Sequence, residues 1–229
     1  MTSSAFSCSE MQEAAVLRQH RLQHRRVGQE ITSLAPLREL YPEPAGRAVL
    51  KQLTHLDVHC ARFISLSPFV VLATSSADGK ADASPRGGAP GFVKVRDAHT
   101  LLIPDSPGNN RLDSLSNVIG SGRAGLLFMI PGINETLRVN GKAVLSIDAG
   151  ELAACAGDRR TPKLVIRTGV EEAYLHGAKA FMRSGLWQPA SQVPRSMLPP
   201  MGQMIAGQTG IAGPVETQEE MERRYAPDL

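Results

Sequence analysis

The sequence predicts a mainly β fold with flanking helices (α+β), built as an antiparallel barrel rather than a doubly wound parallel sheet. Three observations predict it: short β-rich apolar runs recur from residue 69 to residue 176, tight turns separate them, and the intervening helices are short. No G-x-G-x-x-G motif follows a strand, and no Walker A loop or metal-spaced His/Glu cluster occurs. The common nucleotide-binding α/β folds are therefore not indicated.

The first 63 residues have the pattern of helices. Residues 1–31 form a basic arm or helix, rich in Arg and His, with a thin apolar stripe. This composition favours a solvated helix or a disordered tail, and contact with an acidic partner or nucleic acid is the alternative. Residues 32–63 have apolar side chains at helical spacing, interrupted by Pro42 and Pro44.

The strands begin with the apolar run at residues 69–76, which ends in Asp78-Gly79, a strong hairpin signal. Residues 81–95 return as a second strand, which several Gly and Pro residues interrupt. Residues 99–105 form a third strand, entered by the turn at 96–99. We expect the second and third strands to pair around that turn.

The remaining elements follow in order. Residues 110–122 predict a helix, because leucines and branched residues recur at helical spacing before two glycines. Strands are predicted at 124–132, 135–146 and 162–176, with a short helix capped by Asp148 between the last two. Residues 188–229 form a Pro/Gly/Met-rich extension that ends in a short polar helix. The main domain is thus expected at residues 32–187.

The composition is that of a soluble globular protein. Net charge is +3 over 229 residues, too small to argue for nucleic acid, so no nucleic-acid partner is expected. No apolar run reaches the roughly 20 residues needed to span a bilayer. The three cysteines are widely spaced with no C-x-x-C pair, which argues against disulfides and zinc and favours the reducing cytoplasm.

One stretch, "IPDSPGNNRLDSLSNV" at residues 103–118, predicts an anion site. A turn of Gly and Asn followed by Arg111 offers free N–H groups and a positive charge at the start of a helix, where Ser114 adds a hydroxyl. Many ordinary turns have the same composition. If the flanking strands pair, Lys94 and Arg111 can converge on one doubly negative group.

These residues resemble the pyridoxamine 5′-phosphate oxidase-like flavoproteins. Lys94 takes the place of the family's strand Lys, Asn109 that of its Ser, and Asn110-Arg111 that of its Arg-Lys pair. Downstream, "ETLRVNG" matches the family's Arg-Gln-Val-Arg-Val-x-Gly run, with Thr136 at the cofactor-contacting Gln. "SPRGGAPGFVKV", "LLIPDSPGNNRLDSL" and "EEAYLHGAKA" are similar to a bacterial subgroup of uncharacterised FMN-dependent proteins, over residues 32–187.

The resemblance implies a split β-barrel that binds FMN at a homodimer interface. Cations and turn N–H groups would hold the phosphate, and main-chain groups near Arg86 and Ile103 would face the ring. The residues expected to bind the cofactor are Arg86, Gly87, Lys94, Ile103, Asp105, Asn109, Asn110, Arg111, Ser114 and Thr136. No catalytic residue and no metal ligand is assigned.

The implied function is an FMN-dependent oxidoreductase. It would move hydride or electrons between a small organic substrate or nicotinamide donor and an acceptor such as oxygen, a quinone or a nitro compound. The oxidase proper holds pyridoxal with an Arg-x-His stretch near its C-terminus, and no such stretch follows Trp187 here, so oxidation of pyridoxamine phosphate is not expected. The alternatives are a deazaflavin, haem with His99 or His176 as axial ligand, or a non-catalytic flavin-binding or sensor protein.

Overall fold

The computed structural model describes residues 30–44, 46–157, 160–210 and 213–228. The predicted arm at 1–31 lies outside them, apart from its last two residues. The described chain divides after Gly46 into two units, and α2 (Leu34–Leu40) is the helix of the first. The division expected from the sequence, at residues 31 and 187, stays a prediction.

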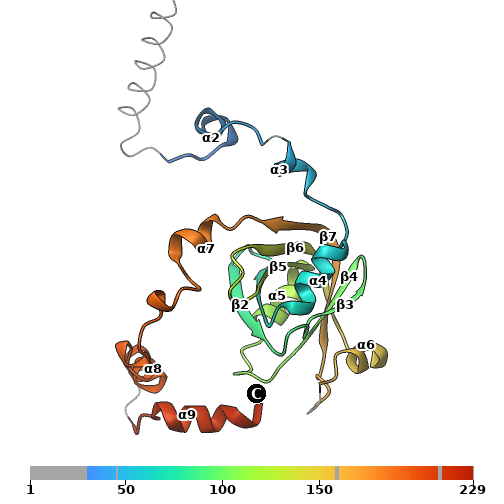
Figure 1. The fold of residues 1–229 in the computed structure, drawn as a ribbon. Coiled ribbons are helices and arrows are strands. Elements are labelled where there is room, and N and C mark those ends of the chain that lie inside the picture. Colours follow the sequence, from blue (N-terminus) through green and yellow to red (C-terminus); the bar gives the residue numbers. More distant parts are fainter. Residues whose placement is uncertain (1–29, 45, 158–159, 211–212, 229) are drawn as a thin grey trace, which may run out of the picture. The chain divides into compact units, whose positions relative to one another are not determined.

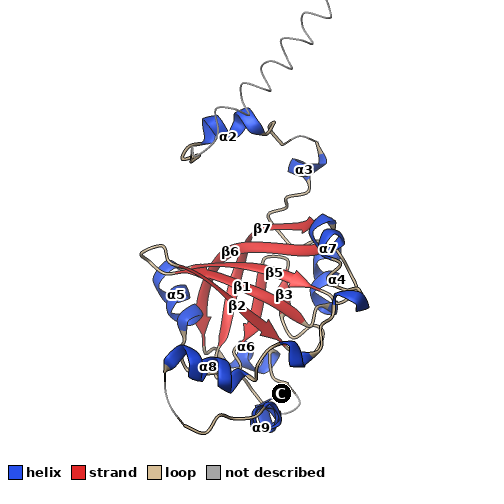
Figure 2. Ribbon diagram, turned by 90° about the vertical axis from the view of Figure 1, so that its left-hand side faces the viewer, coloured by secondary structure: helices blue, strands red, loops and turns tan. Residues whose placement is uncertain are grey.

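The second unit is built on one seven-stranded antiparallel sheet, which confirms the predicted fold class (Figure 1). Its order is β2-β1-β5-β6-β7-β4-β3. The strands are β1 (Phe69–Ser75), β2 (Ala81–Gly87), β3 (Lys94–Asp97), β4 (Thr100–Pro104), β5 (Arg123–Met129), β6 (Thr136–Ser146) and β7 (Val165–His176). In Figure 2 the strands run side by side, with α5 at one end of them.

The same unit contains short helices, of which α4 and α5 pack against the sheet. They are α3 (Arg47–Leu50), α4 (Val58–Leu66), α5 (Asp113–Ser121), α6 (Ala149–Ala154), α7 (Lys179–Ser184), α8 (Met201–Thr209) and α9 (Gln218–Tyr225), with 3-10 turns η1 (Pro189–Ser191), η2 (Arg195–Met197) and η3 (Ala226–Asp228). The predicted cap of α6 is confirmed, because the Asp148 carboxylate accepts from the N–H groups of Gly150 and Glu151. The sequence analysis did not predict α8.

One strand assignment was wrong. Residues 81–95, expected as a single interrupted strand, are two strands, β2 and β3, which occupy opposite edges of the sheet. Between them, Gly91 has a positive φ of 77° and Gly88 leaves no room for a Cβ beside Phe92. These glycines turn the chain from one edge to the other. The expected pairing around residues 96–99 is confirmed, since Lys94 pairs with Leu102 in the β3–β4 hairpin.

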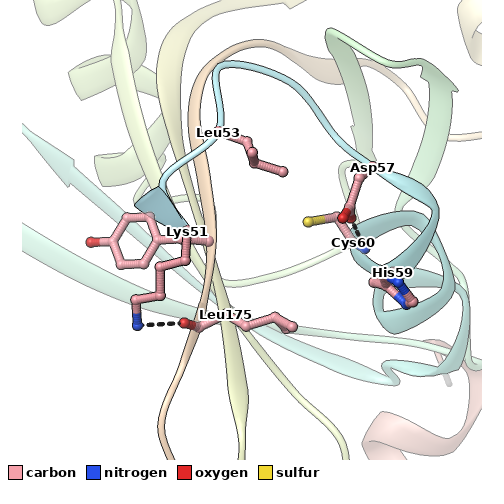
Figure 3. A pocket seen from close by; sticks show the side chains of 7 residues that line it. Lys51, Leu53, Asp57, His59, Cys60 and Leu175 are labelled. Atoms are coloured by element: carbon pink, nitrogen blue, oxygen red, sulfur yellow. Dashed lines mark hydrogen bonds between the residues drawn. The ribbon is translucent and has the colours of Figure 1, made fainter. Parts of the chain in front are cut away.

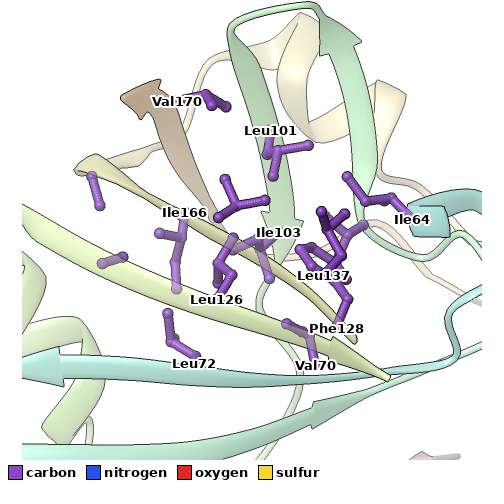
Figure 4. Close-up of a cluster of buried hydrophobic side chains, with 14 of the residues drawn as sticks. Ile64, Val70, Leu72, Leu101, Ile103, Leu126, Phe128, Leu137, Ile166 and Val170 are labelled. Carbon is purple, nitrogen blue, oxygen red and sulfur yellow. The ribbon is translucent and has the colours of Figure 1, made fainter. Parts of the chain in front are cut away.

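The core lies on one face of the curled sheet (Figure 4). Alternate residues of the strands point into it, as in β1, where Val70 and Leu72 are fully buried. Helices α4 and α5 contribute Ile64 and Val118 to the same cluster. Each large apolar side chain buried in this way stabilises the fold by about 1.5–3 kcal/mol.

The outer half of β7 is covered by a segment before α4. β4 pairs with β7 only as far as Gly169. Beyond that point Leu53 forms an isolated antiparallel bridge with Ala173, with N–H···O distances of 2.9 and 2.8 Å in the two directions. The Leu56 N–H then donates to the carbonyl of Ala98 at 2.8 Å. Main-chain bonds therefore fix this segment on both sides before α4 begins.

Candidate functional site

The edge strand β2 turns polar side chains toward the core. Directly paired residues share a face, and the register sets Asp82, Ser84 and Arg86 opposite the buried Thr74, Leu72 and Val70. The other face of β2 carries the exposed Ala83, Pro85 and Gly87. A polar inner face on an apolar sheet needs partners, and the chain provides them from β4 and α5.

Arg86 and Asp105, both predicted as site residues, contact each other. Arg86 Nη1 lies 3.5 Å from Asp105 Oδ1, and the two side chains are 19% and 20% exposed. β2 is at one edge of the sheet and Asp105 follows β4 near the other, so this contact spans the opening of the barrel. The Nε of Arg86 is buried and has no hydrogen-bond partner among the described residues. An unpaired buried donor costs about 1–3 kcal/mol, which a ligand acceptor would recover.

Ser114 is also brought to this strand. Its hydroxyl donates to Asp82 Oδ2 at 2.7 Å, and the Thr74 hydroxyl donates to the same oxygen at 3.3 Å. Asn117 Nδ2 donates to Thr74 Oγ1 at 3.1 Å. The sequence analysis missed Asp82, although the alternation of "ADASPRG" contains the signal that alternate polar residues share one face.

The turn before α5 has unusual backbone geometry. Asn110 and Leu112 have φ of 58° and 59°, and they are the only non-glycine residues with positive φ among those described. Arg111 lies between them and its N–H donates to Asn109 Oδ1 at 3.1 Å. Alternation of left-handed and ordinary residues points successive N–H groups toward one side, as in the anion-binding concavities called nests. A left-handed leucine costs about 1–2 kcal/mol.

This geometry corrects the predicted start of the helix. α5 begins at Asp113 rather than at residue 110, because the left-handed backbone of Leu112 cannot continue a right-handed helix. Arg111 is 73% exposed on its side chain, and its Nε donates to Asp113 Oδ2 at 2.8 Å. The hydrogen bond and charge of Asp113, with the charge of Asp82, raise the pKa of Arg111.

Lys94 has different partners from Arg111. Its Nζ donates to the carbonyl of Gly91 at 3.0 Å, and its side chain is half-buried at the start of β3. The ammonium also opposes the effect of burial on Cys155, whose pKa is raised because burial dominates. No contact between Lys94 and Arg111 is recorded within the described part of the chain.

The remaining predicted residues lie on the strands. Ile103 is fully buried, so only its main chain can face a ligand, and it extends beyond the last β3 partner of β4. Thr136 is buried at the start of β6 opposite His176, and Gly87 ends β2 opposite Phe69. The structure thus joins Arg86 with Asp105, and Ser114 with Asp82, whose charge also acts on Arg111. Within the described residues, neither Lys94 nor Thr136 has a hydrogen bond or ion pair with either group.

A separate cavity of about 230 Å³ lies between α4 and the outer half of β7 (Figure 3). It is lined by Lys51, Leu53, Asp57, His59, Cys60, Tyr174 and Leu175. Asp57 caps α4 by accepting from the Cys60 N–H at 2.8 Å, which lowers the pKa of its carboxyl. Burial, helped by a hydrogen bond to Asp57, raises the pKa of the Cys60 thiol to about 11. This thiol is therefore neutral near pH 7.

The described residues contain neither a metal-binding cluster nor a membrane-spanning helix. They contain no group of three or more His, Cys, Asp or Glu side chains that could hold a metal ion. Every helix in the same ranges is too short or too polar to span a membrane.

Comparison with known proteins identifies the family. Solved structures with a similar fold include HupZ of group A Streptococcus (17% identity, 52% of this chain and 93% of that chain, TM-score 0.44). They also include the FAD binding protein of Mycobacterium smegmatis (14%, 54% and 97%, 0.39) and general stress protein 26 of Bacillus anthracis (15%, 52% and 94%, 0.37). No curated protein matches the chain. The sequence model of the pyridoxamine 5′-phosphate oxidase family matches residues 56–177, more than half of the chain, and the protein belongs to that family.

Proposed function

We propose that the protein is an FMN-dependent oxidoreductase. It transfers hydride or electrons between a small organic substrate or nicotinamide donor and an acceptor such as oxygen, a quinone or a nitro compound. Family membership supports a flavin-type cofactor. The observation that carries the proposal for this chain is the strained turn at Asn110 and Leu112, which surrounds the exposed Arg111.

The residues present fit the cofactor. Arg111 and the N–H groups of the turn would hold the phosphate, with Lys94 as a second cation. The unpaired Nε of Arg86 would donate to an acceptor on the ring, next to the main chain of Ile103 and Asp105. FMN, when bound, supplies the hydride or electron transfer. The charges of Asp113 and Asp82 act on Arg111 and would also repel the phosphate. Binding of the phosphate would therefore depend on the positive charge of Arg111.

The rival cofactors receive no specific support. A haem would need an axial histidine in a closed pocket, yet His99 and His176 are both exposed. His99 instead lies against His55, with ring centroids 6.1 Å apart. A deazaflavin would use the same ring site, and cofactor identification separates it from FMN. Oxidation of pyridoxamine phosphate is not proposed, since no Arg-x-His stretch follows Trp187.

The proposal includes a homodimer with the cofactor at its interface. On the outer face of the sheet, the register aligns Pro85, Val71 and Leu127 in one row across β2, β1 and β5. Pro85 is exposed and the other two are half-buried. An apolar row on an uncovered sheet face is a common subunit contact. A cytoplasmic location, inferred from the separate cysteines, belongs to the same proposal.

The test begins with the absorbance spectrum of the purified protein and mass identification of the compound released on denaturation. FMN and riboflavin are then titrated into the stripped protein and into Arg111→Ala. Because riboflavin lacks the phosphate, only FMN affinity should fall, by about 10- to 100-fold for a lost charge-assisted contact. Arg38→Ala is the matched control, since Arg38 is also exposed and ion-paired, to Glu43.

Two results would contradict the proposal. A colourless protein that takes up neither flavin would exclude the cofactor. Wild-type FMN affinity in Arg111→Ala would show that the turn does not hold the phosphate.

A further inference from the structure

The cavity beside β7 is too small for the proposed cofactor. Its volume of about 230 Å³ is below the roughly 300–1,000 Å³ typical of pockets for drug-sized ligands. It is also separate from the Arg86 and Arg111 groups, because none of its seven lining residues belongs to either. Any ligand of this cavity must therefore be small, and the walls decide its chemistry.

The walls are held in place by hydrogen bonds. The Leu53–Ala173 bridge fixes the segment before α4 to β7. On the other side, the Asp57 cap fixes the first turn of α4. A cavity between two such anchors exists before any ligand binds, so little ordering opposes binding.

Most of the wall is apolar. Leu53 and Leu175 face the same space as the thiol of Cys60, which is neutral near pH 7 (Figure 3). Cys60 is buried and Leu53 is half-buried, so apolar surface lies at the inner end of the cavity. These walls suit a small apolar body, such as an aromatic ring or a branched alkyl group.

The carboxylate of Asp57 is the one acidic group in the lining. It accepts from the N–H of Cys60 at 2.8 Å and from its thiol, which occupies two of about four lone-pair positions. The cap bond also lowers the pKa of the carboxyl, so it is ionised at neutral pH. Within the described residues Asp57 has no ion-pair partner. The N-terminus of α4 supplies only about half a positive charge, so the full charge of the carboxylate is not balanced.

The two basic side chains of the lining do not neutralise this carboxylate. Lys51 Nζ donates to the carbonyl of Leu175 and lies 5.7 Å from the centroid of the Tyr174 ring. Adjacent residues of a strand point to opposite faces, so the ammonium belongs to the face of Tyr174 and not to that of Leu175. Figure 3 shows Lys51 and Asp57 on opposite sides of Leu175. His59 acts on the carboxylate from an exposed position, without an ion pair.

We propose that this cavity binds a small organic amine, with its apolar body between Leu53 and Leu175 and its ammonium at the carboxylate of Asp57. An ammonium brings N–H donors and a positive charge to a carboxylate that has free acceptor positions and no cation of its own. The neutral thiol of Cys60 leaves the apolar part of the wall without charge. The site goes beyond the proposed flavin function and does not require it.

The test uses three probes that share a ring and differ in charge: benzylamine, benzyl alcohol and benzoate. Binding to the purified full chain is followed by ligand-observed NMR with and without added salt. Benzylamine should bind most tightly and benzoate least, and salt should weaken benzylamine alone.

Asp57→Asn removes the charge and keeps the cap, because Asn is as good an N-cap residue as Asp. This variant should weaken benzylamine about tenfold, as expected for a lost charge-assisted contact, and leave benzyl alcohol unchanged. Asp148→Asn is the matched control, since Asp148 caps α6 in the same way and lies outside the cavity. It should bind all three probes as the wild type does.

A further variant blocks the cavity itself. Leu175→Trp fills it from a side chain that is 41% exposed, so the fold should tolerate the change, and both benzylamine and benzyl alcohol should be lost. The proposal is overturned if benzylamine fails to bind, if Asp57→Asn binds it normally, or if Leu175→Trp leaves binding intact. Each result is independent of flavin content.

Discussion

Among the described glycines, Gly141 is the one where an added Cβ would come closest to the main chain of a neighbouring strand. β6 and β7 pair with an irregularity after Asn140: Asn140 faces Glu172, but Gly141 faces Val170, so Glu171 is an extra residue. A Cβ on Gly141 would lie 1.8 Å from the carbonyl oxygen of Gly169 and 3.2 Å from the N of Glu171. Both obstacles are main chain, which cannot rotate away as a side chain would.

The expected loss in the free energy of unfolding follows from the displacement that Gly141→Ala requires. Cβ contacts below 3.0 Å are essentially never seen, so β7 must move by more than 1 Å at the bulge. Ordinary overpacking costs about 1–3 kcal/mol, and the rigid backbone places this change at the upper end, near 3 kcal/mol. For a chain of this size the midpoint of thermal unfolding should fall by about 6–12 °C.

Thermal unfolding followed by circular dichroism measures the effect, with Gly169→Ala as the matched control. Gly169 lies across the same bulge, but a Cβ there meets its nearest atom, the Lys142 carbonyl oxygen, at 3.9 Å. That variant should unfold within about 4 °C of the wild type, since an unstrained Gly-to-Ala change is worth less than about 1 kcal/mol. If both variants unfold together, the close approach at Gly141 does not limit the fold.

Three further predictions follow. Glu151→Gln should lower the free energy of unfolding by about 2 kcal/mol, less than for a fully buried pair, because its partners Arg96 and Arg167 are half exposed. Ser146 and these arginines lower the pKa of the buried Glu151 carboxyl below its ordinary value of 4.5. The stability that the ionised carboxyl contributes is therefore fully present above pH 4.5 and is lost as pH falls through the folded-state pKa. Between pH 6 and 3, the free energy of unfolding measured in urea should fall less for the variant than for the wild type. With a pKa of about 11, the Cys60 thiol should resist iodoacetamide at pH 8 until urea unfolds the chain, and site-resolved mass spectrometry that finds early labelling would contradict its burial. Asp82→Asn should strengthen FMN binding about two- to fivefold and leave riboflavin unchanged, since it removes a carboxylate beside Arg111; an equal change for both ligands would place Asp82 away from the phosphate.

The sequence correctly predicted the hairpin and the helix cap, which depend on residues close together in the chain. Asp78-Gly79 forms the expected hairpin, with Gly79 at a φ of 85°, and Asp148 caps α6 as predicted. Each depends on residues within a few positions of one another. The prediction of a single strand at 81–95 was wrong because it depends on distant residues. Pairing with strands far along the chain decides which edge of the sheet a strand joins.

The site shows the same limit. The composition of the turn predicted Arg111 as a site residue, and the family resemblance implied Arg86, but nothing local indicates that Arg86 meets Asp105 or that Ser114 meets Asp82. Those contacts exist because the sheet curls until the edge strand β2 approaches the end of β4. The start of α5 was misplaced by three residues, since helical spacing does not reveal a left-handed backbone at Leu112.

The strain and the unpaired donor together favour a ligand at this opening over a purely structural role. Asn110 and Leu112 each adopt a backbone conformation that costs free energy, and Arg86 buries an Nε that has no acceptor among the described residues. A fold selected for stability alone would replace Leu112 with glycine and leave Arg86 exposed or paired at closer range. The strain lies in the turn whose composition predicted an anion site, and the unpaired donor lies in the segment that the family resemblance implies for ring contacts. An acceptor at Arg86 and an anion at the turn would recover them, which is why we assign the cofactor to this opening rather than to the cavity beside β7.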